Sequence, residues 1–231
     1  MDNSFLLPLA SKKRLATLKT GLNILRKKRL AENSLAMTAG RTINTVSQHW
    51  GTPLRYVKAV GEALGGSIEL DPCSNDYSLV KAANEYSLPE TDGLKASWNF
   101  KTIFVNPPYG RDQERGTSIK QWLARCSAAH EDHGAEVIAL VPVATNTAHW
   151  KKHVFVKASA VCFLYDTRLR FLVDGRDEGK GAPMSCAMIY WGPSYQRFFD
   201  VFLKYGAVLD LRNLAGRQVG ASEHSSGDGE E

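Results

Sequence analysis

Two short apolar segments of this chain each run directly into a polar residue followed by proline. Ile68-Glu69-Leu70 leads into Asp71-Pro72, and residues 102–105 lead into Asn106-Pro107. Proline lacks a backbone N–H and restricts the preceding residue to extended geometry, so each segment is expected to be a strand ending at its proline. If the sheet is parallel, an acid and an amide then lie at strand carboxyl ends, where α/β sheets bind ligands.

The rest of the chain alternates buried-strand patterns with helical spacing. A helix should open at Thr52-Pro53, with Thr52 as N-cap and Pro53 as the first helical residue, and close at Gly65-Gly66. Further helices are expected at 117–129, 146–156 and 195–204, and further strands at 137–141, 160–165, 185–191 and 207–211. Strands separated by helices predict an α/β fold with a doubly wound, mostly parallel sheet and flanking helices.

Charge divides the chain into three parts. Eight basic residues lie between Lys12 and Arg29, within a segment (11–33) whose leucines recur at helical spacing, and residues 38–49 are polar like a linker. The last nine residues carry four acids. We therefore expect a basic N-terminal helix and linker (1–47), a main domain (48–215) and an acidic, disordered tail (216–231).

The net charge of +5 favours a polyanionic partner, because bound phosphates release condensed counterions. The leucine stripe of the N-terminal segment fits three roles: packing on the domain, pairing with a second copy, or lying along DNA with arginines on phosphates. The oligomeric state stays open, with a monomer as one option.

The composition argues against a disulfide-rich, a membrane-spanning or a metal-binding protein. The four cysteines form no CxxC pair, and three lie in apolar runs, as expected of reduced core thiols. No apolar run approaches the roughly 20 residues of a membrane span, and the start lacks a secretory signal, so we expect a cytoplasmic protein without a membrane partner. The histidines have no clustered acid or thiol, so no metal is expected.

The segment Asn106-Pro107-Pro108-Tyr109 carries the strongest functional signal. The N6 amine of adenine is a poor nucleophile, because its lone pair is delocalised into the ring. The Asn106 side-chain oxygen and the Pro107 carbonyl could accept its two hydrogens, and Pro108 stiffens the loop. Tyr109 offers a face on which an extruded base can stack. The alternative is a rigid proline turn with no catalytic role.

The order of motifs closely resembles that of phage-type DNA N6-adenine methyltransferases, the Dam-like family. The resemblance covers about residues 48–192, through Trp50-Gly51-Thr52-Pro53, Leu70-Asp71-Pro72-Cys73, Asp92-Gly93-Leu94, Val105-Asn106-Pro107-Pro108-Tyr109-Gly110, Arg168-Leu169-Arg170-Phe171 and Ala182-Pro183-Met184-Ser185. It implies a Rossmann-like methyltransferase fold, S-adenosylmethionine as methyl donor, DNA as partner, and a phage or prophage role in protection from restriction within a bacterial host cell.

The resemblance also implies roles for individual residues. Asp71 and Pro72 would hold the methionine part of the donor, Thr52 and Pro53 would close over it, and Asp92 would contact a hydroxyl or the donor adenine. Phe171 would pack on the flipped base, or else belong to the core. Arg168 and Arg170 alternate with apolar neighbours on one face, which suits phosphate contact or simple solvation. The chain departs from a typical methyltransferase in lacking a glycine-rich turn after Asp71.

Two other functions remain open from the sequence. The same tetrapeptide serves enzymes that methylate a protein glutamine or an amine on a ribosomal RNA base. The second alternative is a non-catalytic DNA-binding protein with a methyltransferase fold. The absence of a glycine-rich turn after Asp71 supports it. The polar loop 174–182 and the termini are the only spare segments for target recognition, so we expect short or relaxed sequence specificity.

Overall fold

The computed structural model describes residues 50–165, 169–177, 182 and 184–214 in full, and only the backbone of the strands at 35–38 and 41–44 before them. The predicted N-terminal helix (11–33) and acidic tail (216–231) lie outside the described residues. No helix in the described part combines the length and apolar character that crossing a bilayer requires.

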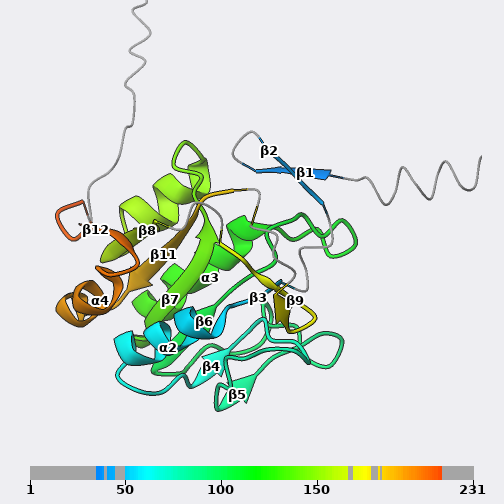
Figure 1. Cartoon of the computed structure of the whole chain (residues 1–231), viewed down its shortest axis with the longest axis horizontal. Coiled ribbons are helices and arrows are strands. Elements are labelled where there is room, and N and C mark those ends of the chain that lie inside the picture. Colours follow the sequence, from blue (N-terminus) through cyan, green and yellow to red (C-terminus); the bar gives the residue numbers. More distant parts are fainter. Residues whose placement is uncertain are drawn as a thin grey trace, which may run out of the picture.

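A seven-stranded sheet forms the centre of the fold (Figure 1). Its order is β12-β8-β11-β7-β6-β4-β5, and the strands are β4 (Leu70–Asp71), β5 (Asn84–Glu85), β6 (Thr102–Val105), β7 (Glu136–Pro142), β8 (Ala160–Leu164), β11 (Cys186–Trp191) and β12 (Gly206–Asp210). The strands predicted from apolar runs are all present, with ends shifted by one or two residues. The two-residue strand β5 was not predicted.

The expectation of a mostly parallel sheet is wrong. β4 pairs in parallel with β5 and β6, and β6 with β7, but β11 runs antiparallel between β7 and β8, and β12 runs antiparallel to β8. All six residues of β11 are buried. A central strand covered on both faces is a continuous apolar run in either direction, so its sequence does not reveal which way it runs.

Helices cover both faces of the sheet, in three layers (Figure 1). On one face, α2 (Leu54–Ala63) and α4 (Tyr195–Phe202) pack on strand residues such as Phe104 and Tyr190. On the other, α3 (Ile119–His133) and the π-helix η2 (Trp150–Phe155) pack on residues such as Ile103 and Trp191. Alternate strand residues point to opposite faces, which splits the core into two apolar clusters.

Two small sheets lie outside the predicted pattern. β3 (Trp50–Gly51) pairs with β9 (Leu172–Val173), which pairs with β10 (Arg176–Asp177). The polar loop predicted at 174–182 is thus partly a hairpin. β1 (Leu35–Thr38) and β2 (Arg41–Asn44) pair in antiparallel, so the linker predicted at 38–49 is wrong over this part. Threonine and isoleucine favour extended backbone there despite the polar composition.

The start of α2 differs from the predicted cap. The helix begins at Leu54 with Pro53 in the N-cap position, and no side chain caps it. Thr52 instead continues from β3, and its hydroxyl is buried with no hydrogen-bond partner in the part of the chain that the structure describes. The predicted cap is therefore wrong by one residue, and the threonine hydroxyl stays available to a ligand.

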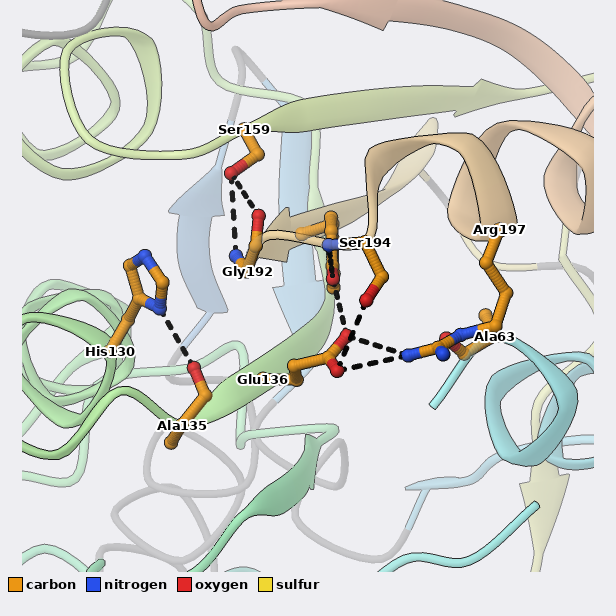
Figure 2. Close-up of polar contacts among 9 residues, drawn as sticks. Ala63, His130, Ala135, Glu136, Ser159, Gly192, Ser194 and Arg197 are labelled. Atoms are coloured by element: carbon orange, nitrogen blue, oxygen red, sulfur yellow. Dashed lines mark hydrogen bonds and ion pairs between the residues drawn. The ribbon is translucent and has the colours of Figure 1, made fainter. Parts of the chain in front are cut away.

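A polar network joins α4 to the amino end of β7 (Figure 2). Arg197 donates from Nη2 to both carboxylate oxygens of Glu136 at 2.9 Å and from Nε to the Ala63 carbonyl at 2.7 Å. The Tyr190 and Ser194 hydroxyls also donate to Glu136. Glu136 thereby connects α2, α4 and the sheet at the end opposite to Asp71 and Asn106.

Replacing Glu136 with alanine should lower the free energy of unfolding by about 2–3 kcal/mol, because three partly buried donor groups lose the four hydrogen bonds that they make to it. The control is Glu131→Ala, which removes only an exposed ion pair to Lys157 and should cost less than about 1 kcal/mol. Urea unfolding measures both. Equal losses in the two variants would show that the network adds no stability beyond a surface pair.

Candidate functional site

The strand order reverses between β4 and β6. The chain passes from β4 outward to β5, then crosses to β6 on the other side of β4 and continues to β7. Ligands of open α/β sheets bind outside the carboxyl ends of the strands at such a reversal. Asp71 ends β4, and Asn106 directly follows β6. The fold therefore places both predicted strand ends at the strand-order reversal, where ligand binding is expected.

The loop that follows β6 holds Asn106 by its amide nitrogen. The Asn106 Nδ2 donates to the Trp50 carbonyl oxygen over 2.8 Å. The side chain is partly buried, and no group in the described part of the chain donates a hydrogen bond to its Oδ1. Pro107 is buried behind it, while Pro108 lines the neighbouring cavities. The geometry leaves one side-chain acceptor free at the end of the sheet.

Tyr109 belongs to a cluster of three aromatic rings. Its hydroxyl donates to the Leu140 carbonyl at 3.1 Å, and its side chain is buried. Phe171 stacks on Trp50 with ring centroids 5.1 Å apart and an interplanar angle of 14°. Tyr109 meets both rings edge-on, at 6.1 Å from Trp50 and 5.6 Å from Phe171. The two aromatics predicted to hold a base are thus in contact with each other and shielded from solvent.

A small cavity of about 30 Å³ joins the two strand ends. Thr52, Asp71 and Asn106 line it together with Trp50, Gly51, Ser78 and other neighbours. Asp71 is buried and accepts hydrogen bonds from the Cys73 N–H at 3.1 Å and the Ser78 hydroxyl at 3.5 Å. The cavity therefore combines the buried carboxyl of Asp71, the Thr52 hydroxyl and the side-chain amide of Asn106.

Burial raises the pKa of Asp71 from 3.8 to about 7, and the nearby Glu85 carboxylate adds to this rise. The hydrogen bonds from Cys73 and Ser78 act in the opposite direction without offsetting it. Among the described residues, no cationic side chain forms an ion pair with this carboxyl. A buried acid of this kind is suited to a cationic ligand group that replaces the lost hydration.

A larger cavity of about 160 Å³ adjoins the small one. Cys73, Asn75 and Pro108 line both cavities, and Pro72, Gly93, Arg115 and Trp122 are among the other walls of the larger one. The Ser74 hydroxyl also lines it and is buried, with no hydrogen-bond partner among the described residues. Each cavity thus holds one buried hydroxyl whose hydrogen-bonding capacity the described part of the chain leaves unused, which is an expected feature of a polar ligand site.

Asp92 holds the loop beside the larger cavity but does not line it. Its Oδ1 accepts from the Leu94 N–H at 3.0 Å and from the Arg115 guanidinium, and Lys95 lies 3.7 Å away. Partial burial works to raise the pKa of Asp92, but the bonds from Arg115 and Leu94 outweigh it and lower the pKa. Arg115, which this carboxylate orients, lies in the cavity wall.

Comparison with known proteins decides the family. A family model described as DNA N-6-adenine-methyltransferase (Dam) matches residues 39–207. The chain belongs to this family. The Dam match includes both cavities, the loop that follows β6 and the three-stranded sheet of β3, β9 and β10. No curated protein and no solved structure gives a significant match.

Family membership assigns the chain to the DNA adenine methyltransferases and confirms the predicted resemblance. The roles given to individual residues stay predictions. For the Dam domain, the structure brings Thr52, Asp71, Pro108 and Asn106 to one cavity. Pro53 is half-buried next to Thr52, and Pro72 lines the larger cavity.

The predicted DNA-contacting arginines are only partly described. Leu169 and Phe171 are buried while Arg170 is exposed, so the expected alternation holds over these three residues. Arg168 lies outside the described residues. Arg176 is exposed on the hairpin strand β10. The Dam domain thus presents cationic side chains beside the aromatic cluster. Among the described residues, no group of three or more histidines, cysteines or acids has a metal-binding arrangement.

Sequence reasoning missed three residues of the site: Trp50, Ser74 and Arg115. Trp50 is visible in the motif Trp50-Gly51-Thr52-Pro53, but its contact with Asn106 spans 56 positions and has no local signal. Ser74 lies in the turn after Asp71, where methyltransferases usually have glycines. A small polar residue in this turn is a sequence signal for ligand contact. Arg115 lies in a polar loop without periodicity, so only the folded cavity reveals it.

Proposed function

We propose that this protein is an S-adenosylmethionine-dependent, site-specific DNA methyltransferase that methylates the N6 amine of adenine. The observation that carries the proposal is the cavity shared by Asp71, Thr52 and Asn106, with the free amide oxygen of Asn106 at its edge. Family membership supplies the reaction class. The position at the strand-order reversal supports a Rossmann-like arrangement of the binding site.

The chain contributes acceptors that act on the target amine. The Asn106 Oδ1 and the Pro107 carbonyl would each accept one N6 hydrogen, which draws the amine toward tetrahedral geometry and frees its lone pair for attack. Because the acceptors are held by a proline-stiffened loop, they need no reorganisation when the reaction occurs. No covalent intermediate on the protein is required.

The two cavities fit the parts of the methyl donor. Asp71 would bind the ammonium group, Thr52 would use its orphan hydroxyl on the same amino-acid part, and Ser74 would contact the nucleoside part in the larger cavity. Pro53, Pro72 and the Asp92-Arg115 pair would shape the walls. When bound, S-adenosylmethionine would supply a methyl group on a positively charged sulfur; the amine nitrogen would gain this methyl group and release one N6 hydrogen as a proton, and the donor would become a neutral thioether.

The aromatic cluster is suited to receive a flipped adenine once one of its rings has moved aside. Trp50 and Phe171 cover Tyr109 in the absence of DNA, so a base that stacks on Tyr109 would displace at least one of them. Burying a base in their place would replace one aromatic contact with another and so limit the cost of extrusion. Arg170 on the exposed side would contact phosphate, as would Arg168.

Donor binding should weaken as the pH falls below 7. The raised pKa means that protonated Asp71 stabilises the ligand-free fold at low pH and that this contribution is lost as the pH rises from about 4 through about 7. Binding of an ammonium group requires the ionised carboxylate, so the donor Kd should rise about fifteenfold in total from pH 7 to pH 5.5, with the slope approaching tenfold per pH unit at the lower end. The donor α-amino group stays protonated throughout this range.

Calorimetric titration with S-adenosylmethionine from pH 5.5 to 8 measures this dependence. Asp71→Asn should bind more weakly at pH 8 and show no such slope. Asp112→Asn is the matched control, since Asp112 lies in the wall of the larger cavity, partly exposed, and should keep the slope. A slope that persists in Asp71→Asn would remove Asp71 from the donor site.

Transfer of a radiolabelled methyl group tests the proposed function as a whole. The full chain is incubated with donor and with unmethylated plasmid DNA, total RNA or bacterial protein, and the nucleosides are then analysed by mass spectrometry. N6-methyladenine in DNA is the expected product. Label in RNA or in protein glutamine would favour the other amine substrates, and DNA binding without donor binding would favour a non-catalytic protein.

A further inference from the structure

The short strand β3 lies directly beside the catalytic loop, although the two are far apart in the sequence. Its Trp50 carbonyl oxygen accepts the hydrogen bond from the Asn106 Nδ2 at 2.8 Å. An asparagine side chain carries an oxygen and an NH₂ group of similar size, and only its network of partners decides which way each points. The Trp50 carbonyl is therefore placed to decide the orientation of this amide.

We propose that Trp50 is a positioning residue of the transfer site, whose main-chain carbonyl keeps the Asn106 oxygen turned toward the substrate amine. A rotated amide would bring its oxygen against the Trp50 carbonyl, acceptor against acceptor, and would present N–H donors to the N–H donors of the amine. The catalytic consequence rests on the proposed function, whereas the orientation of the amide does not.

Contacts on two sides hold the Trp50 carbonyl in place. The backbone of β3 pairs with β9, with Trp50 opposite Val173 and Gly51 opposite Leu172. A Cβ added at Gly51 would lie 3.3 Å from the Leu172 Cβ, so the two strands approach closely. The indole of Trp50 stacks on Phe171 at 5.1 Å. Movement of this carbonyl would therefore disturb the ladder, and also the ring stack as long as no base has displaced one of its rings.

This arrangement explains why position 106 carries an amide and not an acid. An aspartate has two acceptor oxygens and could still accept from the substrate amine, but the ionised form has no hydrogen to donate to Trp50. One of its oxygens would face the Trp50 carbonyl unpaired. The protonated acid could donate that hydrogen, so the Trp50 carbonyl should favour protonation of an acid at this position.

The first test is the pH dependence of kcat for Asn106→Asp relative to the unmodified chain. The ratio should be at most about 0.01 at pH 8.5 and rise at least about tenfold by pH 6, because the acid must be protonated to bond Trp50. Asp71 and Cys73 from the end of β4 and Tyr109 on the same loop are the titratable groups facing this position. They are present in both proteins, so the ratio removes their own effects. A ratio that does not change with pH overturns the proposal.

The second test needs no activity. NMR titration of the carboxyl introduced by Asn106→Asp is carried out in the Asp71→Asn background, which removes the charge of Asp71. A pKa at least about two units above the ordinary 3.9 is expected, falling by about one unit when Trp50→Ala is added. Trp50→Phe, which keeps an aromatic ring for the stack, should retain the raised value. An ordinary pKa in the Asp71→Asn background overturns the proposal.

The two tests separate this proposal from the proposed function. A chain that transfers no methyl group to DNA adenine would refute the function, and the NMR titration would still decide the role of Trp50. A chain that methylates adenine but gives both a flat ratio and an ordinary pKa would refute the positioning role alone.

Discussion

Asn106→Ala is expected to lower kcat for methyl transfer at least about a hundredfold, the scale seen when one preorganised polar group is removed from a transition state. The variant loses the side-chain oxygen that accepts from the substrate amine, and alanine offers no substitute. The donor Kd should change by less than about tenfold, because Asp71, Thr52 and Ser74 are left in place.

Single-turnover kinetics with saturating donor and DNA measure the loss, and calorimetry measures the donor Kd. Asn99→Ala is the matched control. This exposed asparagine precedes β6, at the end of the sheet opposite to Asn106, so the kcat of the variant should equal that of the unmodified protein. Full activity in Asn106→Ala would contradict the catalytic role. A parallel loss of donor binding would instead point to a collapsed cavity.

Gly93→Ala is expected to damage both the fold and donor binding. A Cβ at this position would lie 1.7 Å from the Pro72 carbonyl oxygen, a backbone atom that cannot rotate away. The Trp98 indole also donates to the Gly93 carbonyl over 2.7 Å and fixes the loop from the other side. The free energy of unfolding should fall by about 3 kcal/mol or more, at the upper end of overpacking costs.

The same change should weaken donor binding at least about tenfold, because Gly93 and Pro72 are both walls of the larger cavity. Gly61→Ala serves as the control. This glycine lies within α2, an added Cβ meets no atom within 4 Å, and the variant should gain about 0.5–1 kcal/mol. Thermal unfolding and calorimetry measure both proteins. An unchanged Tm and donor Kd in Gly93→Ala would show that the loop moves freely off the strand end.

The strand ends were predictable because their cause is local. Proline stops a β-ladder and restricts the residue before it, so Asp71-Pro72 and Asn106-Pro107 mark strand ends wherever they occur in the fold. The alternation of apolar runs likewise predicted the main strands and the helices α2, α3 and α4, because periodicity depends only on neighbouring residues. The prediction of Thr52 as the N-cap was wrong because β3 extends to Gly51, Thr52 follows it directly, and the N-cap of α2 is Pro53.

The direction of β11 and its insertion between β7 and β8 were decided by tertiary packing alone. A strand buried on both faces has the same pattern in either direction, and the choice depends on where the chain returns after β8. The β9–β10 hairpin was missed for a similar reason. Each strand is only two residues long, too short for a periodic pattern, and the hairpin is ordered by the pairing of β9 with β3.

The sequence by itself determined which side chains the reaction can use, since the chemistry of an acid, an amide and a tyrosine after strand ends depends on their types and immediate neighbours. Only the tertiary structure decided that Asp71 and Asn106 share a cavity, that the Thr52 and Ser74 hydroxyls have no partner among the described residues, and that the Trp50 carbonyl bonds the Asn106 amide. These relations join residues up to 56 positions apart. Their cause is the order and spacing of strands in the assembled sheet, on which local backbone preferences carry no information.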